Sequence, residues 1–252
     1  MRCVLPLWFL CLSLICSSFS CQDDEKLQLW YDSPARMWEE ALPLGNGRLG
    51  IMPDGGVFRE KITLNDITMW SGTFEDTRNP EALKYLPQIR QLLLEGKNDE
   101  AQQLMYKHFS CGGRGSNGGN GADAPYGSFQ LLGNLNIRYS FQDSSSQEYS
   151  DYRRGLSLGR AFAWTDFRRG KVKYRREYFV SHAEDIIVIK LTADRKEQLY
   201  FDVEIDRPER FSCYSNDGVV YMTGQLNNGT DGNGNRYMAQ MKIVTEDGKQ
   251  VA

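Results

Sequence analysis

The stretch KVKYRREYFVSHAEDIIVIKLTA, residues 171–193, decides the fold class of this chain. In its first part, residues 171–181, apolar and charged side chains alternate, which is the pattern of a β-strand with one buried face. Its last part, DIIVIKLTA at residues 185–193, is a nearly continuous apolar run. Such a run predicts a strand in the middle of a sheet, covered on both faces.

Strand-like patterns continue on both sides of this stretch. They predict further strands at residues 26–31, 56–65, 131–141, 160–167, 198–205, 219–226 and 236–245. Turn-forming residues separate many of them, at positions 169–170, 194–196 and 216–218. Short strands joined by hairpin-like turns are typical of antiparallel sheets. The sequence therefore predicts a mainly β fold, a large antiparallel β-sandwich (super-sandwich) with a short helical insertion around residues 80–109.

The helical insertion has its own start and stop signals. Asn79 can cap a helix whose first position is Pro80, and Gly96 can end that helix. Pro87 lies inside this segment and predicts a break or a kink, while Asn98 can cap a second helix. The apolar residues at helical spacing are Leu83, Leu86, Ile89 and Leu93 in the first segment, and Ala101, Leu104 and Met105 in the second.

A second stretch, LPLGNGRLGIM at residues 42–52, contains the spacing G-x-G-x-x-G of a dinucleotide-binding loop. That fingerprint has meaning only where a buried strand leads into it and a helix begins directly after it. Here Pro43 precedes the first glycine, and Pro53, Gly55 and Gly56 follow the last, which leaves no room for a phosphate-binding helix. We therefore reject the nucleotide interpretation and expect no cofactor.

The amino-terminal residues have the pattern of an export signal. Arg2 precedes an apolar run at residues 3–16 that is too short to span a membrane. Cys21 follows SSFS as in a bacterial lipoprotein cleavage site, although Ser18 stands where such sites carry leucine, so ordinary signal-peptidase cleavage is the alternative. We predict a signal peptide at residues 1–20, lipidation of Cys21 and a tether at residues 21–28. The predicted location is the periplasm or cell surface of a bacterium, with a lipid anchor in the outer membrane.

Composition argues against several classes of site. The 252-residue chain carries a net charge of −3 and no basic stripe for nucleic acid. Four of its six cysteines lie within the first 21 residues, which leaves Cys111 and Cys213 as one disulfide or as two separate thiols. The two histidines, His108 and His182, are too few for a histidine-rich metal site, and we expect His108 to pack on a helix face.

Three long blocks of the chain resemble one known family. They are WEEALPLGNGRLGIMPDGGVFREKITLNDITMWSG (38–72), NPEALKYLPQIRQLLLEGKNDEAQQL (79–104) and YRRGLSLGRAFAWTDFRRGKVKYRREYFVSHAEDIIVIKLTA (152–193). Together they resemble the amino-terminal β-sandwich domain of glycoside hydrolase family 95, over residues 29–252. That family comprises α-L-fucosidases, which act chiefly on α-1,2-linked fucose, and some α-L-galactosidases.

The resemblance implies that catalysis belongs to another domain. Family members hydrolyse with inversion, using a glutamic acid and an asparagine-assisted aspartate on an (α/α)6 barrel that follows the sandwich. No position of this chain matches those motifs, so we assign no catalytic residue and expect the chain, which ends at Ala252, to be inactive alone. Its implied partners are that barrel and, through the parent enzyme, fucosylated glycans. Carboxylates such as Glu60 and Asp66 are interpreted as residues of solvated faces.

Five residues are candidates for a substrate-binding or domain-interface surface: Trp38, Asn46, Arg48, Asn65 and Trp70. Tryptophan faces stack on sugars, and asparagine and arginine hydrogen-bond to hydroxyl groups, but domain packing and turn formation compete with that interpretation. The glycine-rich loop at residues 45–50 is either a bulged hairpin or a surface pressed against a neighbouring domain or a sugar ring. The expected function is that of the non-catalytic amino-terminal domain of an exported α-L-fucosidase-like enzyme. The alternatives are a stand-alone carbohydrate-binding surface lipoprotein and a purely structural domain.

Overall fold

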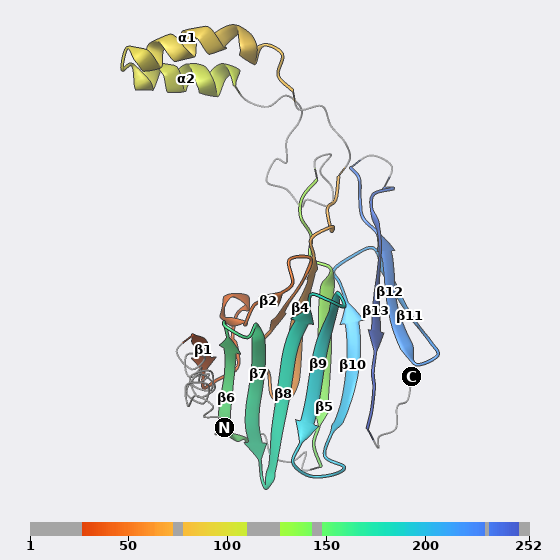
Figure 1. Ribbon diagram of the computed structural model, residues 1–252. Helices are drawn as coiled ribbons and strands as arrows, with labels where there is room; N and C mark the ends of the chain where they lie inside the picture. The colour runs from red at the N-terminus through yellow and green to blue at the C-terminus, as the bar shows by residue number, and fades with distance from the viewer. Residues whose placement is uncertain (1–26, 73–77, 110–126, 143–147, 230–231, 247–252) are drawn as a thin grey trace, which may run out of the picture. The chain divides into compact units, whose positions relative to one another are not determined.

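The computed structural model describes residues 27–72, 78–109, 127–142, 148–229 and 232–246 (Figure 1). The chain divides into two compact units. The first contains the residues up to Leu64 together with residues 135–204, and the second contains residues 65–134 and the residues from Ile205 onward. The fold is mainly β, as the sequence predicts, with three sheets and two α-helices among the described residues.

The first unit is built from two five-stranded sheets that face each other. One has the antiparallel order β1-β6-β7-β8-β9 (Gln28–Tyr31, Ser150–Ser157, Phe162–Arg169, Val172–Ser181 and Ile186–Ala193). The other has the order β10-β5-β4-β3-β2 (Tyr200–Asp206, Gly133–Ser140, Arg59–Asp66, Leu49–Pro53 and Leu44–Gly45), and the ends of β4, β5 and β10 belong to the second unit. Figure 1 shows β4 and β5 behind β8 and β9, which is the predicted sandwich arrangement.

Strand β8 contributes much of the buried interior of the sandwich, because buried and exposed side chains alternate along it. Tyr174, Arg176 and Tyr178 are buried, whereas Lys173, Arg175 and Phe179, which alternate with them, are exposed. Successive strand residues point to opposite faces, so this parity places the three buried side chains on the inner face. Tyr174 belongs to a core cluster that also contains Val57, Tyr152 and Phe167.

The prediction that residues 185–193 form a central strand is wrong. This segment is β9, which lies at the edge of its sheet and pairs on one side only, with β8. Its residues are half-buried or exposed, and Ile186 is among the exposed ones. An apolar run reports that both faces of a strand are partly covered, but it contains no information on how many neighbours the strand has.

Two strands, β6 and β11 (Phe211–Asn216), are absent from the sequence prediction, and the β2-β3 hairpin is only one of its two alternatives for residues 45–50. Strand β6 has the sequence SDYRRGLS, and its buried positions include Arg154 and Ser157 beside Tyr152 and Leu156. Because two of those buried residues are polar and residues 154 to 157 are all buried, the strand lacks the apolar alternation by which half-buried strands are found.

The second unit contains a three-stranded antiparallel sheet and a helical hairpin. The sheet has the order β11-β12-β13, with β12 at Val219–Gln225 and β13 at Arg236–Lys242. The hairpin consists of α1 (Ala82–Leu94) and α2 (Asn98–His108), which confirms the predicted helical insertion. None of the helices in the described residues is long and apolar enough to cross a membrane.

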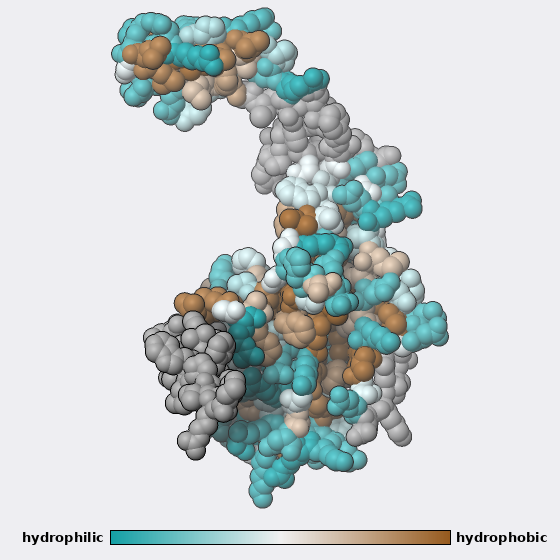
Figure 2. Space-filling model, viewed as in Figure 1, coloured by the Kyte–Doolittle hydropathy of each residue, from teal (hydrophilic) through white to brown (hydrophobic). Residues whose placement is uncertain are grey.

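The predicted start and stop residues of the two helices can be compared with the observed ends of α1 and α2. Gly96 follows α1 as predicted, and the ring of His108 stacks on Tyr85 with centroids 3.5 Å apart, so this histidine is packed. Of the break or kink predicted at Pro87, the break does not occur, since α1 is continuous through this residue. Asn98 is the first residue of α2 rather than its cap. Hydrophobic residues are also visible on the surface of the helical hairpin (Figure 2).

Candidate functional site

Asn46 and Arg48 lie in the loop of the β2-β3 hairpin, in the first unit. The Asn46 side-chain oxygen accepts hydrogen bonds from the backbone amides of Arg48 (2.9 Å) and of the next residue (2.7 Å). Its amide nitrogen donates to the Ser181 carbonyl and to the Asp185 carboxylate, both at 2.9 Å. Gly47, with φ +95°, makes the tight turn without steric cost. The glycine-rich loop is therefore a hairpin tied to the turn between β8 and β9.

Arg48 strengthens the same connection. Its guanidinium forms an ion pair with Asp185, and about half of the arginine side chain remains exposed. The hydrogen bonds from Asn46 and Arg48 hold the pKa of Asp185 below its usual range. The polar groups of the Asn46 side chain thus form hydrogen bonds within the protein, whereas part of the Arg48 side chain remains exposed. The structure brings these two candidate residues together. The hydrogen bonds that the Asn46 side chain makes within the turn explain why an asparagine occupies this position.

Trp38 lies on a short 3-10 helix, η2 (Trp38–Glu40), in the same unit, and its side chain is 56% exposed. The buried Arg154 of β6 positions this segment. Its Nε donates to the Ser33 carbonyl (2.8 Å), and its Nη1 donates to the Glu40 carbonyl (2.7 Å). Its guanidinium also lies 4.2 Å from the ring centroid of Tyr31. Trp38 is therefore an exposed aromatic residue on a segment held by one buried arginine.

Trp70 lies in the second unit and is the centre of an exposed apolar surface. Its indole Nε1 donates to the Ile67 carbonyl (3.0 Å), and its ring meets Phe129 edge to face with centroids 5.5 Å apart. The exposed fractions are 55% for Ile67, 50% for Trp70 and 41% for Phe129. Asn235 donates to the Trp70 carbonyl (3.2 Å). We call Ile67, Trp70 and Phe129 the Trp70 surface.

Asn65, at the end of β4, precedes that surface in the chain. Its side-chain oxygen is buried and has no hydrogen-bond partner within the described part of the protein. Leaving such a group unpaired costs about 1–3 kcal/mol. The next residue, Asp66, is buried and accepts hydrogen bonds from the Thr68 amide (2.8 Å) and hydroxyl (2.6 Å). The interpretation of Asp66 as a solvated carboxylate is therefore wrong, because it forms the turn that leads to Trp70.

Glu60, the second carboxylate assigned to a solvated face, is buried in the sandwich interior with 1% exposure. Its carboxylate pairs with Arg176 at 3.0 Å and accepts hydrogen bonds from the hydroxyl groups of Tyr139 (2.9 Å) and Tyr178. Arg176 also donates to the carbonyl of Val57 at 2.8 Å. Burial, followed by the charge of Glu60, raises the pKa of Tyr178 well above its usual value. The carboxylate can be buried because Arg176 and two tyrosine hydroxyl groups donate hydrogen bonds to it.

This buried cluster has features of a catalytic site. Burial, with the Glu60 charge adding to it, raises the pKa of Asp54 to about 6, although a hydrogen bond from the Gly56 amide (2.8 Å) opposes the shift. Two nearby carboxyl groups in different environments are a common acid–base arrangement. Buried ion-pair networks perturb pKa values as well, however. Because Glu60 is fully engaged by Arg176 and the tyrosines, we assign the cluster to stability rather than to catalysis.

The raised pKa of Asp54 predicts a pH-dependent stability. The protonated carboxyl is favoured in the folded state, so its contribution is fully present below about pH 4 and is lost as the pH rises through about 6. Asp54→Asn keeps an acceptor for the Gly56 amide but cannot ionise. We expect the variant to be more stable than the unmodified chain by about 2 kcal/mol at pH 8, and nearly equal to it at pH 4. Urea unfolding at both pH values measures this difference. Equal pH dependence in the two proteins would contradict it.

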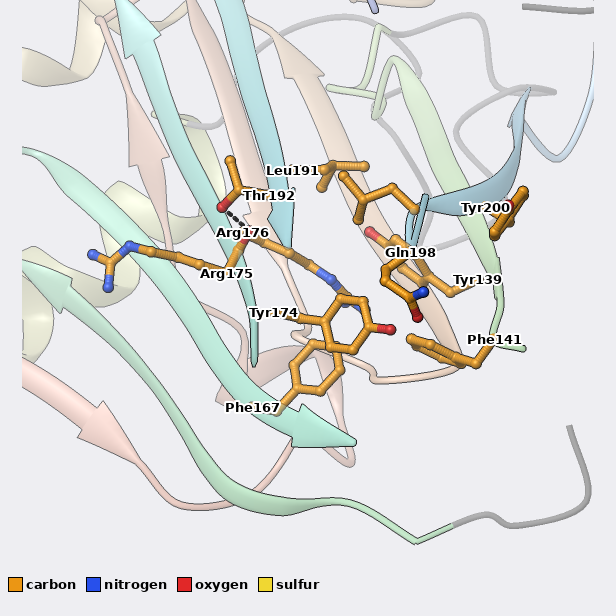
Figure 3. A pocket seen from close by; sticks show the side chains of 11 residues that line it. Tyr139, Phe141, Phe167, Tyr174, Arg175, Arg176, Leu191, Thr192, Gln198 and Tyr200 are labelled. Atoms are coloured by element: carbon orange, nitrogen blue, oxygen red, sulfur yellow. Dashed lines mark hydrogen bonds between the residues drawn. The ribbon is translucent and has the colours of Figure 1, made fainter. Parts of the chain in front are cut away.

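The hollow between the aromatic residues of the first unit does not provide a sugar site. Its wall includes Tyr174, which stacks on Phe167 (centroids 5.1 Å apart) and meets Phe141 edge to face (5.2 Å). Figure 3 shows these rings together, with the Arg175 side chain pointing away from them. The space that they leave holds about one water molecule. The interior of the sandwich is therefore packed.

The structure thus separates the five candidate residues into three places. Asn46 and Arg48 meet on Asp185, Trp38 lies on η2, and Asn65 and Trp70 belong to the second unit. Cys21 and Cys111 lie outside the described residues, and the Cys213 sulfur donates to the Ile205 carbonyl at 3.3 Å. Among the residues described, no group of three metal-ligating side chains comes together.

Sequence reasoning missed the partners that define these places. Asp185 and Phe129 had no motif to mark them, because each acts through a contact made in three dimensions. Arg176 did have a signal, since it shares the parity of Tyr174 and Tyr178 on β8 and so belongs to the same strand face.

Comparison with known proteins shows that this chain is similar to the amino-terminal part of glycoside hydrolases. The family model described as "Glycosyl hydrolase family 65, N-terminal domain" matches residues 29–252. The chain is 33% identical over 182 residues to alpha-L-fucosidase 2 of Arabidopsis thaliana, which covers 71% of this chain and 20% of that protein. It is 30% identical over 207 residues to probable alpha-fucosidase A of Aspergillus niger, covering 77% of this chain and 24% of the relative.

A third relative, probable alpha-fucosidase A of Aspergillus oryzae, is 28% identical over 214 residues, covering 80% of this chain and 27% of its own length. The chain therefore spans about a quarter of the length of these relatives. The family model carries the number 65, while the relatives are named as fucosidases, in agreement with the family 95 motifs. The chain belongs to this family of glycoside hydrolase amino-terminal domains, and the resemblance to the α-L-fucosidase domain of family 95 is confirmed.

Proposed function

We propose that this chain serves as the non-catalytic amino-terminal domain of an exported α-L-fucosidase, and that it orients a catalytic (α/α)6 barrel. The reaction of the parent enzyme is the inverting hydrolysis of α-L-fucosides, chiefly those with α-1,2 linkages. Cys21 carries the lipid that holds the enzyme on the bacterial outer membrane. The relatives' names and the share of their length that this chain covers support the assignment to an enzyme.

The observation that carries the orienting role is the Trp70 surface. Ile67, Trp70 and Phe129 are large apolar residues with exposed fractions between 41% and 55%. Tryptophan and phenylalanine in such clusters are typical of the buried centre of an interface. A packed domain would cover these exposed rings.

A Trp70→Ala substitution, made in the gene product that includes the barrel, tests whether the Trp70 surface orients the barrel. We expect the substitution to weaken the domain contact by about 2 kcal/mol or more, because a central aromatic residue is lost. The product should then lose much of its fucose-releasing activity and should unfold in two steps. In the 252-residue chain alone, the same substitution should leave the unfolding temperature nearly unchanged, since Trp70 is exposed there.

Trp30→Ala is the matched control, because Trp30 is 57% exposed but lies in the first unit. Equal effects of the two substitutions would contradict the interface. A coding frame without any barrel would contradict the enzyme assignment itself. Saturable binding of fucosyllactose by the chain, with quenching of its tryptophan fluorescence, would then favour the stand-alone carbohydrate-binding lipoprotein.

A further inference from the structure

The sheet of the second unit has one face that points to solvent. Along β13, Arg236, Met238 and Gln240 are exposed, whereas the residues between them are half-buried. Their partners across the sheet are Gln225, Thr223 and Tyr221 of β12, respectively. Cross-strand partners share a face, so these rows lie together. The opposite face carries Met222, which has no exposed surface. We call the solvent side the outer face of the β11-β12-β13 sheet.

The outer face is basic although the chain as a whole is acidic. Arg236 and Lys242 are its charged residues within the three strands, and no acidic residue occupies an outer-face position there. Arg210, which follows Glu209, adds a third cation directly before β11. Asp217 lies in the turn between β11 and β12, at the other end of the sheet from Arg210 and Arg236. The net charge of the whole chain is −3, so this face differs from the average surface and suits an anionic ligand.

An open groove of about 820 Å³ lies at the end of the sheet where Arg210, Gln225 and Arg236 meet. Its size is within the range of sites that bind small molecules. The Tyr237 hydroxyl donates to the Arg210 carbonyl at 2.7 Å, which fixes the backbone there. That contact requires Gly224, because a Cβ at this position would lie 2.2 Å from the Tyr237 hydroxyl oxygen. The glycine and the tyrosine thus fix the backbone of Arg210 beside the groove, and its guanidinium donates to the Gly232 carbonyl at 3.5 Å.

An aromatic pair continues the surface along the strands. The rings of Tyr214 and Tyr221 are stacked, with centroids 5.0 Å apart and planes 10° apart, and Tyr214 is half exposed. Tyr221 precedes Gln225 by four residues, which corresponds to about 13 Å along a strand. A ligand that contacts both the arginines and the tyrosines therefore needs the length of an oligosaccharide rather than of a single sugar.

We propose that the outer face of the β11-β12-β13 sheet binds an acidic oligosaccharide. Arg210 and Arg236 bind its carboxylate or sulfate groups, and Tyr214 contacts the apolar face of a sugar ring. Guanidinium groups match the geometry of such anions, and aromatic rings present the apolar surface that sugar rings prefer. This site is separate from fucoside hydrolysis, so its test is independent of the parent activity.

Calorimetric titration of the full chain tests this site with four probes. These are oligogalacturonate, which carries carboxylates; sulfated dextran, which carries sulfates; unmodified dextran; and duplex DNA. We expect saturable binding of one or both of the acidic glycans, weakening as salt is added because the contacts are ionic. The acidic glycan that binds more tightly shows whether the site prefers carboxylate or sulfate groups. Neutral dextran should not bind, and DNA should bind more weakly than the acidic glycan.

Substitutions then locate the binding. Arg210→Gln combined with Arg236→Gln should weaken the binding of the acidic glycan about tenfold or more, since charge-assisted hydrogen bonds are lost. Tyr214→Ala should weaken it without changing its salt dependence. Arg195→Gln, at an exposed arginine of the first unit, is the matched control and should leave affinity unchanged. No binding, equal binding of neutral dextran, tighter binding of DNA, or an equal loss in Arg195→Gln would overturn the proposal.

Discussion

Replacing Glu60 with glutamine is expected to lower the free energy of unfolding by about 3–5 kcal/mol. Glutamine has nearly the same shape, but it removes the negative charge that lies 3.0 Å from the guanidinium of Arg176. Arg176 is itself buried, with 2% exposure, so the substitution removes the ion-pair partner of a buried cation. The hydroxyl groups of Tyr139 and Tyr178 also lose a charged acceptor. Denaturant unfolding of the two proteins measures the effect.

Glu177→Gln is the control for this prediction. Glu177 lies one position after Arg176 on the opposite face of β8, where it pairs with Arg175 at 3.0 Å in a partly exposed setting. Such pairs contribute up to about 1 kcal/mol, so this variant should remain close to the unmodified chain. Adding Arg176→Met to Glu60→Gln should recover part of the loss, because the uncompensated charge is removed. A Glu60→Gln loss as small as that of Glu177→Gln would contradict a structural role for the ion pair.

Arg154→Met is expected to destabilise the first unit by about 3 kcal/mol and to free the segment that carries Trp38. Methionine fills the buried space of the arginine stem but cannot donate to the carbonyls of Ser33 and Glu40. Both acceptors then lose a charged donor, and the contact of the guanidinium with the Tyr31 ring is lost as well. Hydrogen exchange should therefore accelerate at residues 31–40 before the rest of the sandwich opens.

Arg153→Met is the matched control for Arg154→Met. Arg153 is the neighbouring residue on the outer side of β6, and its guanidinium lies 5.1 Å from the exposed Trp30 ring. This variant should lose less than about 1 kcal/mol, since the contact is open to solvent. Uniform acceleration of exchange across the sandwich in Arg154→Met would show that the arginine acts on the whole fold and not on the Trp38 segment.

Strand periodicity predicted most of this fold, because alternating side chains report which face of a strand is covered. It identified β8 and the helical hairpin, where Tyr174 and Tyr178 or Leu83 and Leu86 recur at the right spacing. It failed for β6, in which Arg154 occupies a buried position, and it could not tell that β9 lies at a sheet edge. Polar residues that are satisfied inside a sandwich remove the pattern on which such predictions depend.

The candidate surface was harder to predict than the fold. Asn46 and Trp70 could be singled out by residue type, but Asp185 is 139 residues from Asn46 in the chain and Phe129 is distant from Trp70 in sequence. Glu60 was misplaced for the same reason. A glutamate is usually exposed, and its burial depends on Arg176, which lies on a strand of the facing sheet.

The release of fucose by the purified 252-residue chain tests the proposed division of labour most directly. The chain is incubated with 2′-fucosyllactose, which carries an α-1,2-linked fucose, and free fucose is measured against a blank without protein. Because its buried carboxylates are engaged by Arg176 and by backbone amides, we expect no release above the blank. Sustained turnover by the chain alone would contradict the assignment of catalysis to a separate barrel.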